Sequence, residues 1–291
     1  MLSETRRLLR TALAGWWNDR AMSLGASIAF FTVFSLAPML LCAIAVAGLA
    51  FGREAAQGAV VAEFGGLLGD KAAAAVEAMI VSAADVGSGV VGTTVGFLTF
   101  LLVATGAIVE LQDDLNLIWK AKPPERYGVG AFVRTRLLSL GLVVGVGFLL
   151  LVSLVLDAGL TRLGAYLESG FSGATVMLHV LNSAVAFAVA VMLFAMIFKV
   201  LPAVDLTWRD VWMGAVVTGI LFTAGKFLIG FYLGKSQVAS SYGAAASIIT
   251  ILLWIYYSSL ILLFGAEFTK AYAESRGSRS GQDAPTATAM G

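Results

Sequence analysis

The chain has 291 residues, of which 59% are hydrophobic and 13% charged, and its mean hydropathy is +0.90. Soluble domains carry roughly 25% charged residues, so this composition excludes an ordinary soluble globular domain. The formal charge of +1 leaves no basic excess for binding nucleic acid. One cysteine and one histidine exclude an intrachain disulfide and a multi-histidine metal site. The sequence therefore predicts a membrane protein.

The first 21 residues are predicted to form an amphipathic helix on the cytoplasmic surface of the membrane. Four large apolar side chains recur there at helical spacing and are expected on one face, namely Leu9, Leu13, Trp16 and Trp17. Arginines in this segment would meet anionic lipid headgroups, and the tryptophans would lie at headgroup depth. Membrane lipids are therefore the first expected partners.

Six apolar stretches are long enough to cross a hydrocarbon core of roughly 30 Å as helices. They cover approximately residues 22–50, 89–110, 137–157, 174–198, 211–233 and 244–266. The predicted fold class is therefore all-α, with a six-helix transmembrane domain over residues 22–274. Between the first two spans, residues 53–88 are alanine-rich and too long for a plain connection, which predicts one or two further helices. Residues 275–291 lack apolar periodicity and are predicted to be a disordered cytoplasmic tail.

Lysine and arginine are unevenly distributed over the segments that connect these spans. With both termini in the cytoplasm, 14 of the 19 lie on that side, Lys226 lies within the fifth span, and 4 lie on the other side, namely Arg53, Lys71, Arg162 and Lys235. Basic residues are enriched on the cytoplasmic side of membrane proteins. The sequence therefore predicts cytoplasmic termini and an extracytoplasmic location for residues 53–88.

Short motifs occur in a fixed order between residues 20 and 272. The first span reads AFFTVFSLAP at 29–38, and DLNLIW follows the second span at 114–119. Later come FKVLP at 198–202, GK at 225–226, YGA at 242–244, WIY at 254–256 and GAE at 265–267. In this order the motifs resemble the YihY/virulence factor BrkB family, formerly labelled ribonuclease BN. The resemblance implies a bacterial inner-membrane protein with six spans, often regarded as a transporter, without defining a substrate.

Polar side chains gather where the second span is predicted to leave the membrane, and they include Glu110, Asp113, Asp114 and Asn116. Glu267 ends the sixth span at the same membrane face and could join this group through Arg134 or Arg136. Two interpretations stay open. The group is either a solvated helix end paired with Lys120 and Lys122, or a cytoplasmic gate that attracts cations.

Lys226 is predicted to lie deep in the fifth span, where an unpaired ammonium costs on the order of 3 kcal/mol. Steps of four residues from Gly214 through Thr218, Phe222 and Lys226 form a stripe that is expected to face the helix bundle. A structural role would pair Lys226 with helix-end carbonyls or with Asp157. A functional role would place it beside a cavity that attracts a lipid phosphate or a carboxylate substrate.

Other polar residues could extend such a substrate path, namely His179, Asn182, Ser247 and Thr250. Each also has a structural interpretation, as a hydrogen-bonded histidine or as a hydroxyl bound to its own helix. Pro38 lies within the first span and is a candidate hinge, or a static kink in which Ser35 satisfies the freed carbonyl of Phe34.

Three classes of function follow from these features. The first is a transporter or lipid-handling protein with a cavity between its helices, acting on an anionic lipid or a small molecule. The second is a non-transporting scaffold for envelope partners, and either could be a homo-oligomer. The third, a nuclease or other enzyme, is not expected, because metal-dependent phosphodiester cleavage needs several ligands around its ions. No cofactor is expected.

Overall fold

The computed structural model describes residues 2–84, 90–121, 174–235 and 246–279, together with Gly130, Gly141 and Gly145. Within these residues the regular elements are all helices: α1 (Leu2–Asn18), α2 (Ala21–Phe51), α3 (Arg53–Leu68), α4 (Asp70–Ala84), α5 (Val90–Ile118), α7 (Ala174–Val200), α8 (Trp208–Lys235) and α10 (Ala246–Arg276). Apart from Gly141 and Gly145, the predicted third span, 137–157, lies outside the described residues, as does the predicted tail after residue 279. Residues 275–276, predicted to begin the disordered tail, instead form the last residues of α10. The predicted all-α class agrees with the described part.

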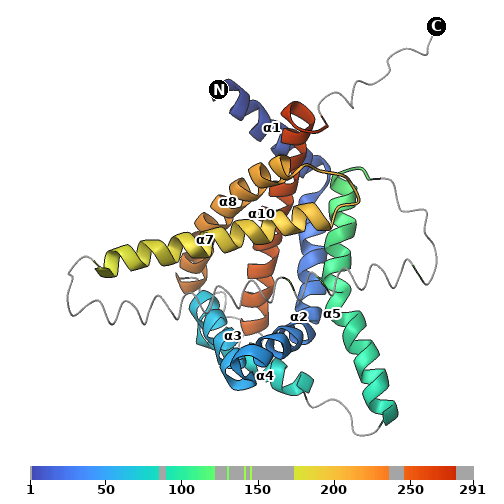
Figure 1. The fold of residues 1–291 in the computed structure, drawn as a ribbon, viewed down its shortest axis with the longest axis vertical. Helices are drawn as coiled ribbons and strands as arrows, with labels where there is room; N and C mark the ends of the chain where they lie inside the picture. Colours follow the sequence, from blue (N-terminus) through green and yellow to red (C-terminus); the bar gives the residue numbers. More distant parts are fainter. Residues whose placement is uncertain are drawn as a thin grey trace.

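The long helix α10 lies at the centre of the molecule. It packs against α1, α2 and α8, while α5 covers α2 and α7 covers α8. The main hydrophobic core lies among these helices and includes Leu115 of α5, Phe198 of α7 and Leu263 of α10, all fully buried. In Figure 1, α7 lies across the direction of α2, α5 and α10, and its N-terminal end extends beyond them.

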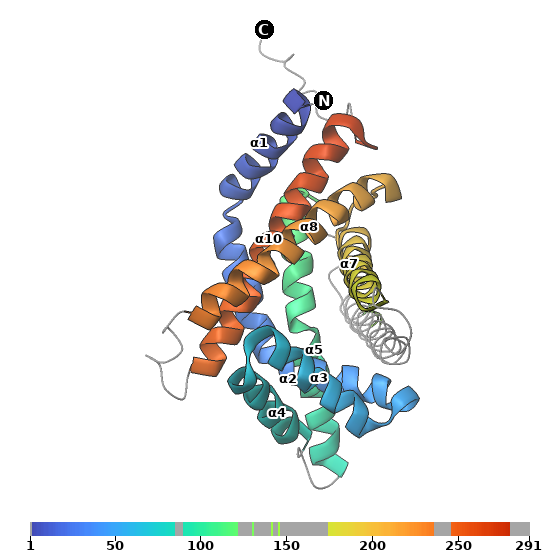
Figure 2. The same ribbon diagram turned by 90° about the vertical axis from the view of Figure 1, so that its left-hand side faces the viewer.

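The short helices α3 and α4 form a separate layer at the end of the molecule opposite α1, as Figures 1 and 2 both show. Gly52 and Gly69 immediately precede α3 and α4 and have φ values of 86° and 85°, a range that glycine adopts without steric cost. Val76 and Ile80 of α4 pack with Ile44 of α2 and Ile251 of α10 in a second hydrophobic core. Residues 53–84 of the predicted helical segment are therefore two helices that pack on the others through an apolar face.

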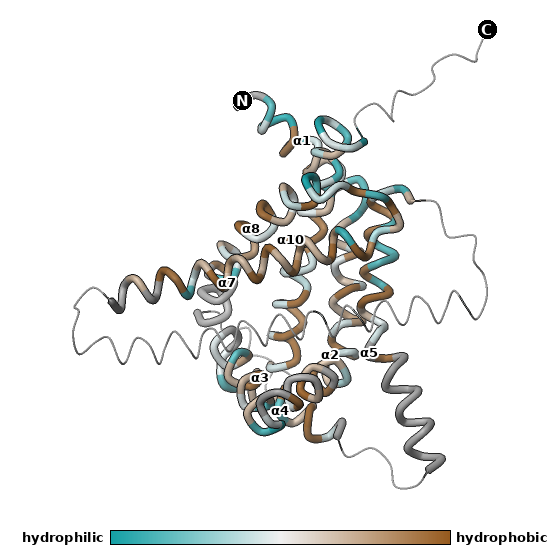
Figure 3. Tube along the Cα trace, viewed as in Figure 1, coloured by the Kyte–Doolittle hydropathy of each residue, from teal (hydrophilic) through white to brown (hydrophobic). Residues whose placement is uncertain are grey.

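Three of the described helices contain stretches long and apolar enough to cross a membrane, namely Ala21–Ala45, Val180–Val200 and Ala246–Arg276. They correspond to the predicted first, fourth and sixth spans. Large apolar side chains such as Phe34 and Leu228 are exposed on the outside of the helices, and Figure 3 shows hydrophobic residues along much of α2, α7 and α10. The predicted second and fifth spans fall on α5 and α8, and the count of six stays a prediction.

Helices α8 and α10 approach closely through two matched pairs of glycine and threonine. Gly214 of α8 lies against Thr269 of α10, and Gly265 of α10 lies against Thr218 of α8. Each threonine hydroxyl donates to the carbonyl four residues earlier on its own helix, at 2.7 Å in both cases. Small residues at four-residue spacing let helices approach without large side chains between them. The predicted bundle-facing stripe is thus confirmed at Gly214 and Thr218.

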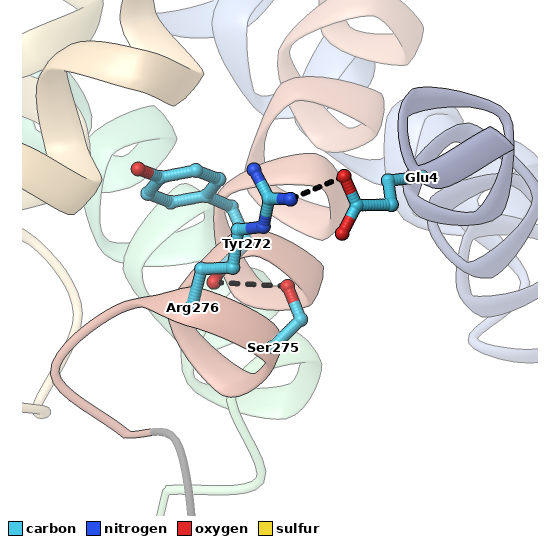
Figure 4. A network of polar contacts seen from close by, with 4 residues as sticks. All are labelled: Glu4, Tyr272, Ser275 and Arg276. Carbon is cyan, nitrogen blue, oxygen red and sulfur yellow. Dashed lines mark hydrogen bonds and ion pairs between the residues drawn. The ribbon is translucent and has the colours of Figure 1, made fainter. Parts of the chain in front are cut away.

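Helix α1 is held along the C-terminal half of α10. The Trp16 indole N–H donates to the carbonyl of Leu260 at 3.2 Å, and Ala12 is fully buried. At the far end of α1, the Arg276 guanidinium lies 2.5 Å from the Glu4 carboxylate (Figure 4). Trp17 faces away and is exposed. The structure therefore divides the tryptophans, predicted to share one face, between α10 and the outside.

Pro38 lies inside α2, as the sequence predicts. The predicted role of Ser35 is wrong, however, because the Ser35 hydroxyl donates to the carbonyl of Val103 on α5 at 2.5 Å. Gly106, three residues after Val103 on α5, faces the same contact, since a Cβ atom there would lie 3.5 Å from Oγ of Ser35. Ser35 therefore joins α2 to α5 instead of repairing the backbone that Pro38 interrupts.

Candidate functional site

The acidic group at the end of α5 is partly buried against α2. Glu110 accepts a hydrogen bond from the Ser27 hydroxyl of α2, and Asp114 lies one turn further along the same face of α5. Asp114 is only 5% exposed, and its Oδ2 atom has no hydrogen-bond partner. Asp113 points outward and is exposed. The three carboxyl groups thus occupy different environments, and Asp114 is the buried one.

Asp114 lies one turn beyond the predicted second span, and its environment favours the neutral acid. Burial, together with the negative charges of Glu110 and Asp113, raises the pKa of Asp114 from 3.8 to about 7. Lys120, predicted as a basic partner, is exposed and forms no ion pair with this group in the described part of the chain. Lys122 lies outside it. A carboxyl group with such a pKa changes its charge near neutral pH.

Asn116 has a different role from these carboxyl groups. Its Oδ1 atom accepts the backbone N–H of Ala203 at 2.7 Å, and Gln112, one turn earlier, donates to the carbonyl of Leu201 at 3.1 Å. Both side chains therefore attach α5 to the turn that follows α7. Asn116 positions the acidic group by fixing the end of α5, and it does not face Asp114 as part of one site.

Glu267 occupies a second acidic site, between α10 and α1. It is 3% exposed, and its Oε1 atom has no hydrogen-bond partner in the described part of the chain. Gly15 of α1 makes room for it, since a Cβ atom there would lie 2.3 Å from Oε2. The charged neighbours that act on Glu267 are Asp19, Lys270 and Glu274, all different from those of Asp114. Arg134 and Arg136, expected to link the two, lie outside the described residues.

Helices α8 and α10 carry three residues of the predicted substrate path, Lys226, Thr250 and Ser247. Phe222 of α8 packs edge-on against Trp254 of α10, with ring centroids 6.2 Å apart, and also against Phe194 of α7. Gly225 of α8 lies against Tyr257 and Ile261 of α10, so Lys226 lies near this level of α10, and Thr250 is seven residues, about 10 Å of helix, from Tyr257. Lys226 is half-buried and Thr250 is buried. Ser247, half-buried, lies about one turn further along α10.

The α7 residues of the predicted path are set apart from Lys226. Helix α7 contacts Gly219 and Phe222 of α8 through Phe187, Val191 and Phe194. Asn182 precedes Phe194 by 12 residues, about 18 Å of helix, on the end of α7 that projects beyond the bundle (Figure 1). His179 lies still further out, and its side chain is outside the described residues, as is Asp157. The structure therefore separates Asn182 from the part of α8 that carries Lys226.

Residues missed by sequence reasoning include Ser27, Asp19 and Gly15, whose partners are on distant segments, and no local pattern identifies them. Sequence reasoning also missed Asp210, although a threonine three residues before an acidic residue, as at Thr207 and Asp210, is a recognisable pattern for the start of a helix. Asp210 is buried and accepts hydrogen bonds from the Thr207 and Ser278 hydroxyls at 2.7 and 2.6 Å. Burial opposes the charge of Asp210, but these hydrogen bonds outweigh it and hold its pKa below the usual value.

In the described part of the chain, no three His, Cys, Asp or Glu side chains are grouped to hold a metal ion. The helices, their exposed apolar side chains and the buried polar groups between them define the class as an all-helical membrane protein. The family model described as Virulence factor BrkB matches residues 12–289. The chain therefore belongs to the virulence factor BrkB family, as the sequence motifs indicated.

Relatives of this family are similar over most of the chain. A UPF0761 membrane protein of Pseudomonas aeruginosa (strain LESB58) is 30% identical over 269 residues, which are 89% of this chain and 61% of that protein. UPF0761 membrane proteins of Rhodospirillum centenum and Ralstonia nicotianae are each 27% identical, over 96% and 90% of this chain and 60% and 57% of their own lengths. The chain thus spans about three fifths of the length of these curated relatives. No solved structure matches it.

Proposed function

We propose that this protein is a transporter or lipid-handling protein of the bacterial inner membrane, with six spans, cytoplasmic termini and a substrate path between its helices. The observation that carries the proposal is Asp114, a buried carboxyl group that has no cation partner among the described residues and a pKa of about 7. Burying such a group costs free energy, and perturbed carboxyl groups of this kind are concentrated at functional sites. A non-transporting scaffold would not need a buried ionisable carboxyl group.

Asp114 would act as a proton-responsive gate. Protonated Asp114 lies beside Glu110 without repulsion, and the hydrogen bond from Ser27 to Glu110 keeps α5 against α2. Loss of the proton places two negative charges one turn apart on the same buried face, and like charges at this spacing repel. The contact between α2 and α5 is then weakened, which would open the path on the side where the carboxyl groups lie. Protons would be the coupling ion.

We expect the wild-type protein, reconstituted in liposomes with a trapped pH-sensitive dye, to carry protons when a membrane potential is imposed. Asp114→Asn should reduce this flux to the level of empty liposomes, because asparagine cannot exchange a proton. Asp113→Asn is the matched control on the same helix turn and should retain the flux, because Asp113 is exposed. Wild-type flux no higher than that of empty liposomes would favour the scaffold.

Lys226 would hold an anionic substrate group in the path. Lys226→Met conserves side-chain length and removes the charge, so the variant is expected to fold while losing at least tenfold in retention of co-purified anionic ligands, measured by native mass spectrometry. Lys71→Met, a change of the same kind at an exposed position of α4, should retain them. Equal retention by both variants would assign Lys226 a structural role.

A further inference from the structure

We propose that the outward face of α1 is a binding surface for anionic phospholipid headgroups. This face carries two arginines and two large apolar side chains at spacings of four, three and four residues, namely Arg6, Arg10, Leu13 and Trp17. Leu9 lies beside them. All five side chains are exposed, with Leu9 at 43%, Leu13 at 56% and Trp17 at 68%. The surface goes beyond the proposed transport, which concerns α5 and α8.

The rest of α1 prevents this face from turning inward. On the opposite side, Ala12 is buried, Gly15 lies against Glu267 and Trp16 is bound to the carbonyl of Leu260. Glu4, bound to Arg276, holds the first turn (Figure 4). Because these contacts lie at both ends and in the middle of α1, the helix cannot rotate about its axis without losing them. Its basic and apolar face is fixed outward.

The position of α1 in the chain brings this face to the depth of lipid headgroups. The apolar stretch long enough to cross a membrane begins at Ala21, only three residues after α1 ends at Asn18. Arg20 between them has a left-handed conformation with φ 54°, which interrupts the helix and lets the chain change direction. In Figures 1 and 2 the C-terminal end of α10 lies alongside α1, and Figure 3 shows hydrophilic residues at this end of α10. The exposed face of α1 therefore lies where a bilayer surface begins.

The chemistry of the face favours a lipid over an acidic soluble partner. Basic side chains alone would suffice to bind an acidic protein segment. The face also presents apolar surface among its arginines, from Leu9, Leu13 and Trp17. This mixture is typical of helices that lie in the membrane interface. Tryptophan is enriched at headgroup depth, and arginine pairs with phosphate through two parallel hydrogen bonds. Glu4, an acidic residue of α1, is on the other side of the helix with Arg276.

Binding can be measured by calorimetric titration of short-chain phosphatidylglycerol into the detergent-solubilised full chain, with short-chain phosphatidylcholine as the neutral lipid. Each basic residue near an anionic surface contributes about fivefold, so Arg6→Gln combined with Arg10→Gln should weaken phosphatidylglycerol binding about thirtyfold. Glutamine retains the helix propensity of arginine. Arg53→Gln, at an exposed site on α3 at the other end of the molecule, should have no effect. Equal affinity for the two lipids, or for the double variant and wild type, would overturn the proposal.

A second measurement locates the face directly, even if the arginine variants alter folding. The protein is placed in nanodiscs that contain phosphatidylglycerol and a lipid with a nitroxide at the headgroup. The contribution of Trp17 to the fluorescence, obtained as the difference between wild type and Trp17→Phe, should be quenched by this lipid. The contribution of Trp16, obtained in the same way from Trp16→Phe, should be protected from quenching, since Trp16 packs on α10. An unquenched Trp17 would remove the lipid as occupant and leave an acidic soluble partner.

Discussion

Replacing Gly214 by alanine is expected to destabilise the protein by about 3 kcal/mol through a clash between α8 and α10. A Cβ atom at this position would lie 1.7 Å from Oγ1 and 2.8 Å from Cβ of Thr269. The threonine cannot swing away without cost, because its hydroxyl is bound to the carbonyl of Gly265. The same holds in reverse for Gly265, where a Cβ atom would lie 1.9 Å from Oγ1 of Thr218. The apparent melting temperature in detergent is the measurement.

The control for this prediction is Gly58 of α3, where a Cβ atom would meet nothing within 4 Å. Gly58→Ala should leave the melting temperature unchanged or raise it, since alanine is the better helix former by roughly 1 kcal/mol. Adding Thr269→Ala to Gly214→Ala should recover part of the loss, because it removes the nearest atom. Such recovery would be a coupling between the two sites. A Gly214→Ala protein as stable as wild type would show that the helices do not approach this closely.

The second large effect concerns Asp114 and pH. Its pKa is about 7 in the folded protein and 3.8 in the unfolded chain, so between these values the folded state binds more protons. The free energy of unfolding therefore falls as pH rises from about 4 to about 7. The difference of about three pH units corresponds to at most about 4 kcal/mol. This stabilisation is fully present below the unfolded pKa and is lost above the folded one.

Asp114→Asn should remove the contribution of Asp114 to the pH dependence of stability, because asparagine stays neutral. Thermal unfolding between pH 5 and pH 8 is expected to show a flatter profile for the variant, and higher stability than wild type at pH 8. Asp113→Asn should retain most of the wild-type slope, because burial is the largest cause of the raised pKa of Asp114 and the charge of Asp113 is a smaller one. Asp210 contributes in the opposite sense, since its lowered pKa makes stability fall at more acidic pH, below the range in which Asp114 titrates. An unchanged slope in Asp114→Asn would mean that its carboxyl group is solvated.

Much of the fold could be predicted from the sequence because it depends on local patterns. Apolar stretches of span length indicated the helices that the structure has as α2, α7 and α10, and the alanine-rich segment after the first span contains α3 and α4. The stripe that begins at Gly214 identified the face of α8 that packs on α10. Motifs in fixed order indicated the family. Composition and periodicity suffice for these conclusions, since the rise and turn of a helix are the same everywhere.

The candidate site depended more on tertiary structure. Sequence proximity grouped Glu110, Asp113 and Asp114 correctly on α5, but burial separates Asp114 from its exposed neighbour. Glu267 was expected near them and instead lies against Gly15 and Asp19. These outcomes depend on how α1 and α10 are rotated and offset.

By itself, the sequence determined the helical class, the membrane character and the family of this protein. The tertiary structure decided which polar groups are buried and what they contact. Ser35 binds α5, Trp16 binds α10 while Trp17 faces outward, and Asp114 lacks a cation partner in the described part of the chain. The physical reason is that periodicity defines the faces of a helix, whereas the neighbour of each face depends on the packing of segments far apart in the chain.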